Sequence, residues 1–121
     1  MPDASELRVL LVEDEPATRV MLARMLERLA CDVLAVGTGA EALRAVEAGV
    51  PLDALVVETS QAHAGRRSVA RAVARRWPRA RLVFTARTLP DLLPDAVNAR
   101  VLVKPLTARD LAEALGRGQP R

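Results

Sequence analysis

The chain has 121 residues, the length of one compact domain, so we expect a single domain over residues 1–121 that ends in a disordered tail at 116–121. Half of the residues are apolar, but only Trp77 and Phe84 are aromatic and Cys31 is the only cysteine, which excludes base-stacking platforms for single-stranded nucleic acid and cysteine-rich metal sites. The formal net charge is only +3 and no apolar run is long enough for a membrane span, so we expect a soluble, cytoplasmic protein without membrane contact.

Apolar runs alternate with amphipathic segments along the whole chain. The run at 7–12 is typical of a buried strand, and Met21, Met25 and Leu29 recur at helical spacing within 16–30. The same alternation predicts further strands at 32–36, 52–57, 80–85 and 100–104, and further helices at 39–48, 66–76 and 108–116. Between the last two strands we expect only a short or distorted helix, because Pro94 follows Pro90 and an interior proline removes a helical hydrogen bond.

Three threonines mark where helices are expected to begin. Thr38, Thr88 and Thr107 each stand three residues before an acid, at Glu41, Asp91 and Asp110, which is the pattern of a capping hydroxyl and its partner. The strand runs are rich in Val and Leu without polar alternation, which indicates strands covered on both faces. We therefore expect an α/β fold, with a five-stranded parallel sheet doubly wound by helices.

The ends of the predicted strands carry polar side chains. In an open α/β sheet, ligands bind beyond the carboxyl ends of the strands. The residues at the strand ends are Glu13, Asp14 and Glu15 after the first strand, Glu58 after the third, Thr85 after the fourth, and Lys104 with Pro105 after the fifth. We expect these acids, the hydroxyl and the amine to converge at one edge of the sheet.

Four segments stand out in this order: VLLVEDEP at 9–16, TGAEAL at 38–43, FTAR at 84–87 and VLVKP at 101–105. Together they resemble the receiver domains of bacterial two-component response regulators, and the resemblance covers nearly the whole chain. It implies the flavodoxin-like (βα)5 receiver fold.

The resemblance also implies roles for the residues at the strand ends. In that family an acid pair binds Mg²⁺, a hydroxyl contacts the transferred phosphate and a lysine pairs with it. Glu13 and Asp14 match the acid pair, Thr85 the hydroxyl and Lys104 the lysine. These residue types suit the chemistry, because Mg²⁺ takes hard oxygen ligands and the phosphoryl group needs its charge neutralised.

The phosphoacceptor position departs from the family. Glu58 stands where the family has aspartate, at 58 − 14 = 44 residues after Asp14, which is the expected separation. Its extra methylene moves the carboxylate by about 1.5 Å, and a misplacement of about 1 Å can cost on the order of a hundredfold in rate. Val101 also replaces the aromatic residue that usually responds to phosphorylation. We therefore expect an atypical receiver with impaired or absent aspartyl phosphorylation, and no enzyme activity.

Three roles for Glu58 stay open. In the first, it reaches toward Lys104 and Thr85 and mimics the phosphorylated state. A hydrogen bond to a charged group contributes about 1.5–3 kcal/mol, which is enough to shift a domain whose inactive and active conformations differ by a few kcal/mol. In the second, it only keeps a charge in a degenerate pocket, and in the third it retains some phosphorylation. Whether the chain binds Mg²⁺ is also open. A cation would be favourable, because without one the three carboxylates would repel one another.

Our leading hypothesis is a module that binds a signalling protein, either a histidine kinase or an output protein. The resemblance implies that the surface of the fourth helix, fifth strand and fifth helix serves partners or a homodimer. The apolar residues expected there are Leu89, Leu92, Leu93 and Val97.

Two alternatives remain. One is a functional phosphorelay receiver that accepts phosphate from a histidine kinase at Glu58. The weaker one rests on the eight arginines between residues 59 and 90, a range without acids, in which Arg67, Arg71 and Arg75 recur every fourth residue. Such a stripe is usually a solvated helix face, but it also suits an acidic protein or nucleic acid. We do not expect DNA binding, because no helix-turn-helix segment accompanies the stripe.

Overall fold

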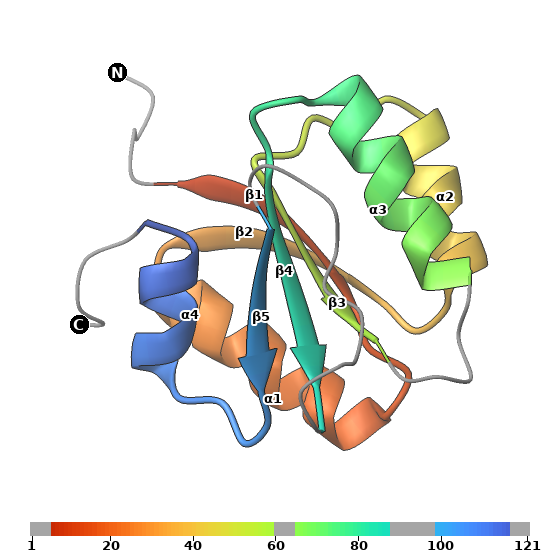
Figure 1. Ribbon diagram of the computed structural model, residues 1–121. Coiled ribbons are helices and arrows are strands. Elements are labelled where there is room, and N and C mark those ends of the chain that lie inside the picture. Colours follow the sequence, from red (N-terminus) through yellow and green to blue (C-terminus); the bar gives the residue numbers. More distant parts are fainter. Residues whose placement is uncertain (1–5, 60–64, 88–98, 117–121) are drawn as a thin grey trace.

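The computed structural model describes residues 6–59, 65–87 and 99–116 (Figure 1). Strands and helices alternate along the chain as the apolar runs predict. The five strands are β1 (Leu7–Val12), β2 (Cys31–Val36), β3 (Ala54–Glu58), β4 (Arg81–Ala86) and β5 (Ala99–Val103). The helices are α1 (Pro16–Arg28), α2 (Gly39–Glu47), α3 (Gly65–Arg76) and α4 (Ala108–Ala114).

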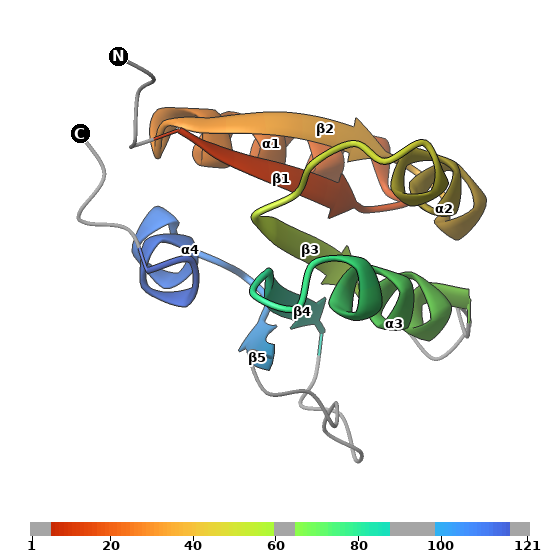
Figure 2. The same cartoon turned by 90° about the horizontal axis from the view of Figure 1, so that it is seen from above.

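The five strands form one parallel sheet in the order β2-β1-β3-β4-β5. Helices α1 and α4 cover one face of this sheet, and α2 and α3 cover the other (Figures 1 and 2). Strand β2 lies on one side of β1, and β3, β4 and β5 follow one another on the other side. This strand order is that of the flavodoxin-like doubly wound fold. The predicted fold class is therefore confirmed.

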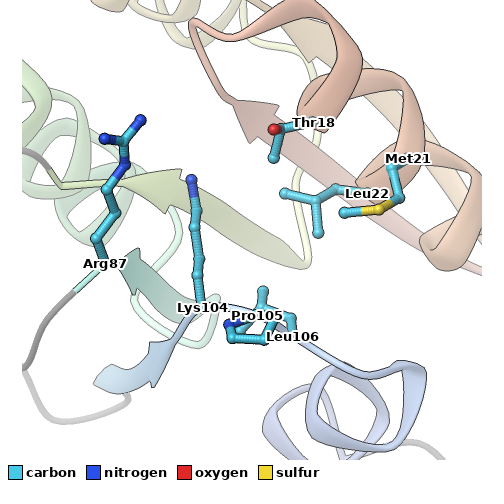
Figure 3. A pocket seen from close by; sticks show the side chains of 7 residues that line it. All are labelled: Thr18, Met21, Leu22, Arg87, Lys104, Pro105 and Leu106. Carbon is cyan, nitrogen blue, oxygen red and sulfur yellow. The ribbon is translucent and has the colours of Figure 1, made fainter.

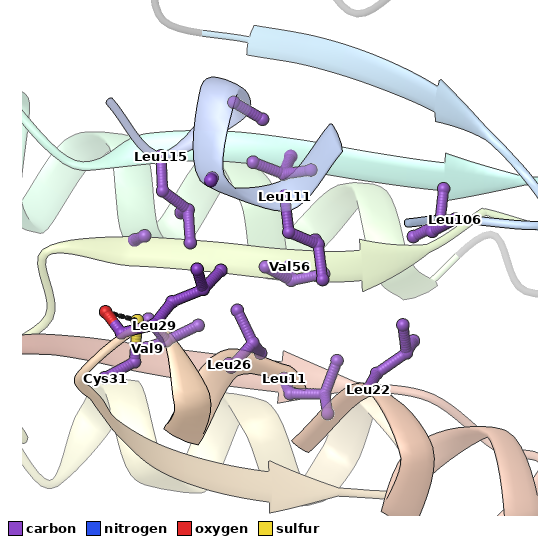
Figure 4. Close-up of a cluster of buried hydrophobic side chains, with 14 residues drawn as sticks. Val9, Leu11, Leu22, Leu26, Leu29, Cys31, Val56, Leu106, Leu111 and Leu115 are labelled. Atoms are coloured by element: carbon purple, nitrogen blue, oxygen red, sulfur yellow. Dashed lines mark hydrogen bonds between the residues drawn. The ribbon is translucent and has the colours of Figure 1, made fainter. Parts of the chain in front are cut away.

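Alternate residues of each central strand serve two separate cores. On β1, Val9 and Leu11 belong to the cluster under α1 and α4 (Figure 4). Leu10 and Val12 belong to the cluster under α2 and α3. All five residues of β3 are buried. Because burying an aliphatic side chain contributes about 1.5–3 kcal/mol, both faces of the sheet stabilise the fold. This burial explains why the strands show no polar alternation.

The helix starts confirm two of the three predicted caps. The Thr38 hydroxyl accepts a hydrogen bond from Glu41 N, and Thr107 forms a reciprocal capping box with Asp110. The cap of α1 was not predicted: the side chain of Glu15 accepts from the backbone amides of residues 17 and 18. The third predicted cap, at Thr88, lies outside the described residues.

Several predicted boundaries are wrong by one or two residues. Helix α1 ends at Arg28 rather than at residue 30, because Ala30 has a φ of 62° and so leaves the helical conformation. Strand β3 begins at Ala54 rather than at residue 52, and Asp53 instead bonds to the start of β1 through Arg8 N. Helix α4 ends at Ala114, two residues early. The helix expected between β4 and β5, and residues 117–121 of the tail, lie outside the described residues.

Two further features bear on the expectations from composition. Cys31 is a buried free thiol at the start of β2. Among the described residues, no helix is both long and apolar enough to cross a membrane.

Candidate functional site

The carboxyl ends of four strands meet at one edge of the sheet, as the sequence predicts. Glu58, the last residue of β3, pairs in register with Thr85 of β4. Lys104 directly follows β5, and its backbone amide donates to Ala86 O at 2.7 Å. Glu13 directly follows β1, and its amide donates to Val36 O at 3.1 Å. Backbone hydrogen bonds between neighbouring strands therefore hold the four side chains at one site.

Three carboxylates gather at this edge. Glu13, Asp14 and Glu58 each offer an oxygen, and these oxygens lie within 4.8 Å of one another. Glu13 and Glu58 are buried, with 1% and 4% of their surface exposed, whereas Asp14 is exposed. Like charges this close repel one another strongly, so the cluster needs a cation.

Lys104 supplies one such cation. Its Nζ lies 2.7 Å from Glu13 Oε1, and the lysine side chain is only 21% exposed. The other carboxylate oxygen of Glu13 accepts a hydrogen bond from Glu15 N at 3.1 Å. An ion pair together with a backbone donor satisfies both oxygens, which offsets the cost of burying the carboxylate. The charge of Glu13 is therefore built into the fold.

Thr85 brings a hydroxyl into the same site. Its side chain is buried, and within the described part of the chain Oγ1 has no hydrogen-bond partner. Leaving a buried hydroxyl unsatisfied costs about 1–3 kcal/mol, so a threonine here is not explained by folding alone. The Thr85 carbonyl, in contrast, accepts from both Thr59 N at 2.8 Å and Thr59 Oγ1 at 3.2 Å. The end of β4 is therefore held in place by Thr59, while the Thr85 hydroxyl has no hydrogen-bond partner among the described residues.

Val101 occupies the position at which the resembling family has an aromatic side chain. It lies on β5 in register with Phe84, is half-buried, and packs against the core under α2 and α3. An aliphatic residue packed in this way offers no ring that could turn between two positions.

The predicted surface residues are only partly described. Arg71 and Arg75 are exposed on α3, away from the strand ends. Arg67 belongs to the same helix, but its side chain is outside the described part of the structure. The four apolar residues predicted for the partner or dimer surface all lie outside the described residues: Leu89, Leu92, Leu93 and Val97.

An open groove of about 360 Å³ adjoins the site. One wall comes from α1, and the other from the ends of β4 and β5, where Arg87 and Lys104 extend in the same direction (Figure 3). Met21 on the α1 wall is 48% exposed, and its neighbour Val20 is 49% exposed. The lining residues are Thr18, Met21, Leu22, Arg87, Lys104, Pro105 and Leu106. The groove therefore combines an apolar floor with two cationic side chains at its rim.

Sequence reasoning missed several residues that shape this edge. Arg19 donates from its guanidinium to Glu13 O at 2.9 Å and so fixes the loop after β1. Thr59 ties the tip of β3 to β4, and Glu15 caps α1 next to the acid pair. For Thr59, its position immediately after Glu58 was the one feature of the sequence that could have indicated a place at the site. The contact of Arg19 crosses from a helix to a loop, and no sequence pattern indicates it.

The geometry of the acidic cluster fits a magnesium ion. Mg²⁺ binds oxygen ligands at about 2.1 Å, so two ligands of one ion lie at most about 4.2 Å apart. Separations within 4.8 Å need only small side-chain movements to reach that geometry. Glu13, Asp14 and Glu58 are the residues that would hold the ion, each through one carboxylate oxygen.

Comparisons with known proteins agree with this description. Sensor protein TorS of Escherichia coli K12 is 27% identical over 113 residues, covering 90% of this chain but 12% of the relative. A response regulator receiver protein from Sinorhizobium medicae WSM419 superposes with a TM-score of 0.76 and 22% identity, covering 94% of each chain. The receiver domain of a sensor histidine kinase from Pseudomonas aeruginosa PAO1, which has a magnesium ion coordinated in its active-site cleft, gives a TM-score of 0.72 with 24% identity and covers 91% of this chain and 94% of that one.

No protein-family model matches the chain. The chain spans about an eighth of the length of TorS, so the similarity concerns one segment of that longer protein. The strand order, the residues at the strand ends and the similar structures nevertheless agree with one another. The chain therefore has the fold of response-regulator receiver domains.

Proposed function

We propose that this chain is an atypical receiver domain, which acts by binding signalling partners and accepts a phosphoryl group poorly or not at all. The observation that carries the proposal is the side chain at the tip of β3. Glu58 is only 4% exposed, so its extra methylene cannot be accommodated by turning the carboxylate into solvent. The carboxylate is displaced by about 1.5 Å relative to aspartate, and near-attack geometry tolerates little displacement. We expect no catalytic turnover by the domain itself.

The pairing of Lys104 supports a structural role for Glu58 over mimicry of a phosphorylated state. A mimic would draw the lysine ammonium to Glu58, but the described ion pair of Lys104 is with Glu13. Val101 also lacks the ring that would respond to such a contact. A Glu58→Gln variant should then leave the amide resonances of β5 and α4 close to those of the natural chain, with Lys104→Met as the matched perturbation of the same site. Large shifts on β5 and α4 in the Gln variant would instead favour the mimic.

The acidic cluster supports Mg²⁺ as a ligand, held by carboxylate oxygens of Glu13, Asp14 and Glu58. When bound, the ion would neutralise the carboxylates and would offset the charge of a phosphoryl group at this edge. Isothermal titration with millimolar Mg²⁺ should give a binding heat that Asp14→Asn removes. Asp32→Asn is the control, because Asp32 is an exposed acid on β2, outside the cluster. No heat for the natural chain would contradict the magnesium site.

A functional phosphorelay receiver is the second candidate. The observation in its favour is that the side chains around Glu58 suit a phosphoryl site: the carboxylates of Glu13 and Asp14, the buried hydroxyl of Thr85 and the ammonium of Lys104 lie at one edge. Similarity to a sensor protein and to the receiver domain of a sensor histidine kinase also fits a place in a phosphorelay. In that case Glu58 would carry the phosphoryl group despite its length.

Phosphorylation in vitro separates the two candidates. The natural chain and a Glu58→Asp variant are incubated with acetyl phosphate and Mg²⁺, and intact mass is measured. We expect no added phosphoryl mass on the natural chain and a labile addition on the Asp variant, because the variant restores the shorter side chain beside intact machinery. A Glu58→Ala variant is the control, because any phosphoryl group that it gains must be attached to a residue other than Glu58. A phosphoryl adduct on the natural chain that Glu58→Ala removes would establish the phosphorelay receiver instead.

A partner protein would reach the site through the groove beside it. The exposed side chains of Val20 and Met21 offer apolar contact on α1, and Arg87 and Lys104 offer positive charge on the opposite rim. These properties suit a histidine kinase or an output protein that brings an apolar helix with acidic edges. Met21→Glu should weaken binding of a cognate kinase or output domain at least tenfold, whereas Arg24→Glu on the same helix, outside the lining of the groove, should not.

A further inference from the structure

Helix α3 presents a row of arginines to solvent on the opposite face of the sheet from α1 and α4 (Figure 1). Arg71 and Arg75 are exposed one helical turn apart, and Arg79 is exposed just beyond the helix. Within the described part of the chain, none of the three is in an ion pair with a carboxylate. Arg76 is placed differently, since its guanidinium lies 5.6 Å from the centre of the Trp77 ring and beside Gly49. We call Arg71, Arg75 and Arg79 the α3 arginine row.

Folding explains only part of the α3 arginine row. Like charges one turn apart on a helix destabilise it by about 0.2–0.5 kcal/mol per pair, and a helix gains a similar amount from acids three or four residues away. No acid stands between residues 59 and 90, so α3 has no such partner. The helix dipole favours a cation at Arg75 in the last turn, but it does not favour one at Arg71 in the middle of the helix.

The other helices of the protein are built differently. Each combines at least one arginine with a glutamate three or four residues away: Glu15 and Arg19 in and before α1, Glu41 and Arg44 in α2, and Arg109 and Glu113 in α4. Only α3, among the described helices, has arginines without this balance. The balance elsewhere shows that an excess of arginine over the chain as a whole does not account for the row. A binding role accounts for charge that costs helix stability.

We propose that the α3 arginine row is a second docking surface, which binds an acidic helix of a partner protein. Arginine presents a planar fork of donors that matches a carboxylate in two parallel hydrogen bonds. Positions one turn apart on a helix are about 6 Å apart, so carboxylates at the same spacing on a partner helix meet Arg71 and Arg75 together. This surface lies on α3, apart from the strand ends, and the inference does not rest on whether Glu58 is phosphorylated.

An acidic protein fits the surface better than nucleic acid does. The formal net charge of the chain is only +3. Helix α2 lies next to α3 (Figure 1), and its Glu41 and Glu47 are exposed. These acids would repel a long phosphate backbone that crosses both helices, but a single partner helix lying along α3 avoids them. Phe84 is buried and Trp77 is half-buried with Arg76 over its ring, so neither offers an open face for base stacking.

Binding to defined probes tests the proposal. The probes are a fluorescent synthetic helical peptide with glutamates at every third and fourth position, and a short fluorescent DNA duplex of equal charge. Anisotropy is measured at low and at physiological salt for the natural chain, for Arg71→Glu/Arg75→Glu and for Arg24→Glu/Arg28→Glu. The last variant changes net charge by the same amount on exposed residues of α1, and circular dichroism checks that all three are folded.

We expect the natural chain to bind the peptide with an affinity that falls as salt rises and that is higher than its affinity for the duplex. The α3 variant should lose at least tenfold in affinity, and the α1 variant less than threefold. Three results would overturn the proposal: no peptide binding at low salt, equal losses in both variants, or tighter binding of the duplex. Equal losses would mean that only net charge matters, and tighter duplex binding would identify a nucleic-acid surface.

Discussion

Lys104 Nζ lies 2.7 Å from Glu13 Oε1 and joins the ends of β5 and β1, which are not adjacent in the sheet. The pair therefore spans the site above β3 and β4 and lies beside the carboxylate of Glu58. Because the lysine is held by Glu13, the site has a positive charge in a fixed place before any ligand arrives.

Lys104→Met should lower the free energy of unfolding by about 1–3 kcal/mol, measured by urea denaturation. The change leaves the buried Glu13 carboxylate without its ion partner and close to two other carboxylates, and the partial exposure of the lysine keeps the loss below the usual 3–5 kcal/mol for a buried pair. Millimolar Mg²⁺ should restore part of the loss.

The double variant Glu13→Gln/Lys104→Met isolates the interaction. It should be more stable than the sum of the single changes predicts, since contacting charges couple by about 0.5–3 kcal/mol. Additive losses would show that the ion pair contributes nothing to stability.

Thr85→Val should leave the free energy of unfolding unchanged or raise it by up to about 1 kcal/mol. Valine has nearly the shape of threonine, and the buried hydroxyl has no hydrogen-bond partner within the described residues that the change would remove. Thr38→Val is the matched control, because the Thr38 hydroxyl caps α2 and its loss should cost about 1 kcal/mol. A loss at Thr85 as large as that at Thr38 would mean that the hydroxyl is structural.

Ala30→Gly and Gly49→Ala should change stability in opposite directions. Ala30 has a φ of 62° and Gly49 a φ of 78°, a conformation that costs an L-residue about 1–2 kcal/mol and glycine very little. Ala30→Gly should therefore stabilise by up to about 1 kcal/mol after the backbone entropy of glycine is subtracted. Gly49→Ala should destabilise by about 1–2 kcal/mol, and more where the new Cβ meets Arg76 at 3.0 Å. Thermal denaturation of both variants beside the natural chain checks the signs.

The contribution of Asp110 to the free energy of unfolding should depend on pH in the acid range. Hydrogen bonds from the Thr107 backbone and side chain lower the pKa of the Asp110 carboxyl below its ordinary value of 3.8. A lowered pKa in the folded state adds stability above the pKa of the unfolded chain, and that stability is lost as the pH falls through the folded pKa. The advantage of the natural chain over Asp110→Asn should therefore shrink below about pH 4.

A second measurement checks the cause of the Asp110 shift. An NMR titration of the Asp110 carboxyl should show a higher pKa in a Thr107→Ala variant, which lacks the hydroxyl. The Ala variant keeps the backbone amide that donates to Asp110, so only part of the shift should disappear. A pKa equal in both chains would contradict the contribution of the hydroxyl.

Element type, element order and two helix starts could be predicted from local pattern, whereas several other boundaries could not. Thr38 and Thr107 cap α2 and α4 as predicted because a capping hydroxyl acts on an amide only three residues away. The cap of α1 by Glu15 was missed, because glutamate is not a usual capping residue. Strand β3 starts two residues late, since Asp53 bonds to Arg8, which is far away in the sequence.

The sequence by itself determined the parallel sheet, its two covered faces and the set of polar residues at the strand ends. These follow from hydrophobic periodicity and from short-range spacing, which act within a few residues of the chain. Only the tertiary structure decided which partner each polar group takes: Lys104 binds Glu13, 91 residues away, and the Thr85 hydroxyl is buried with no partner among the described residues. Charge pairs and burial depend on distances between residues on different strands, and the amino-acid sequence alone does not give those distances.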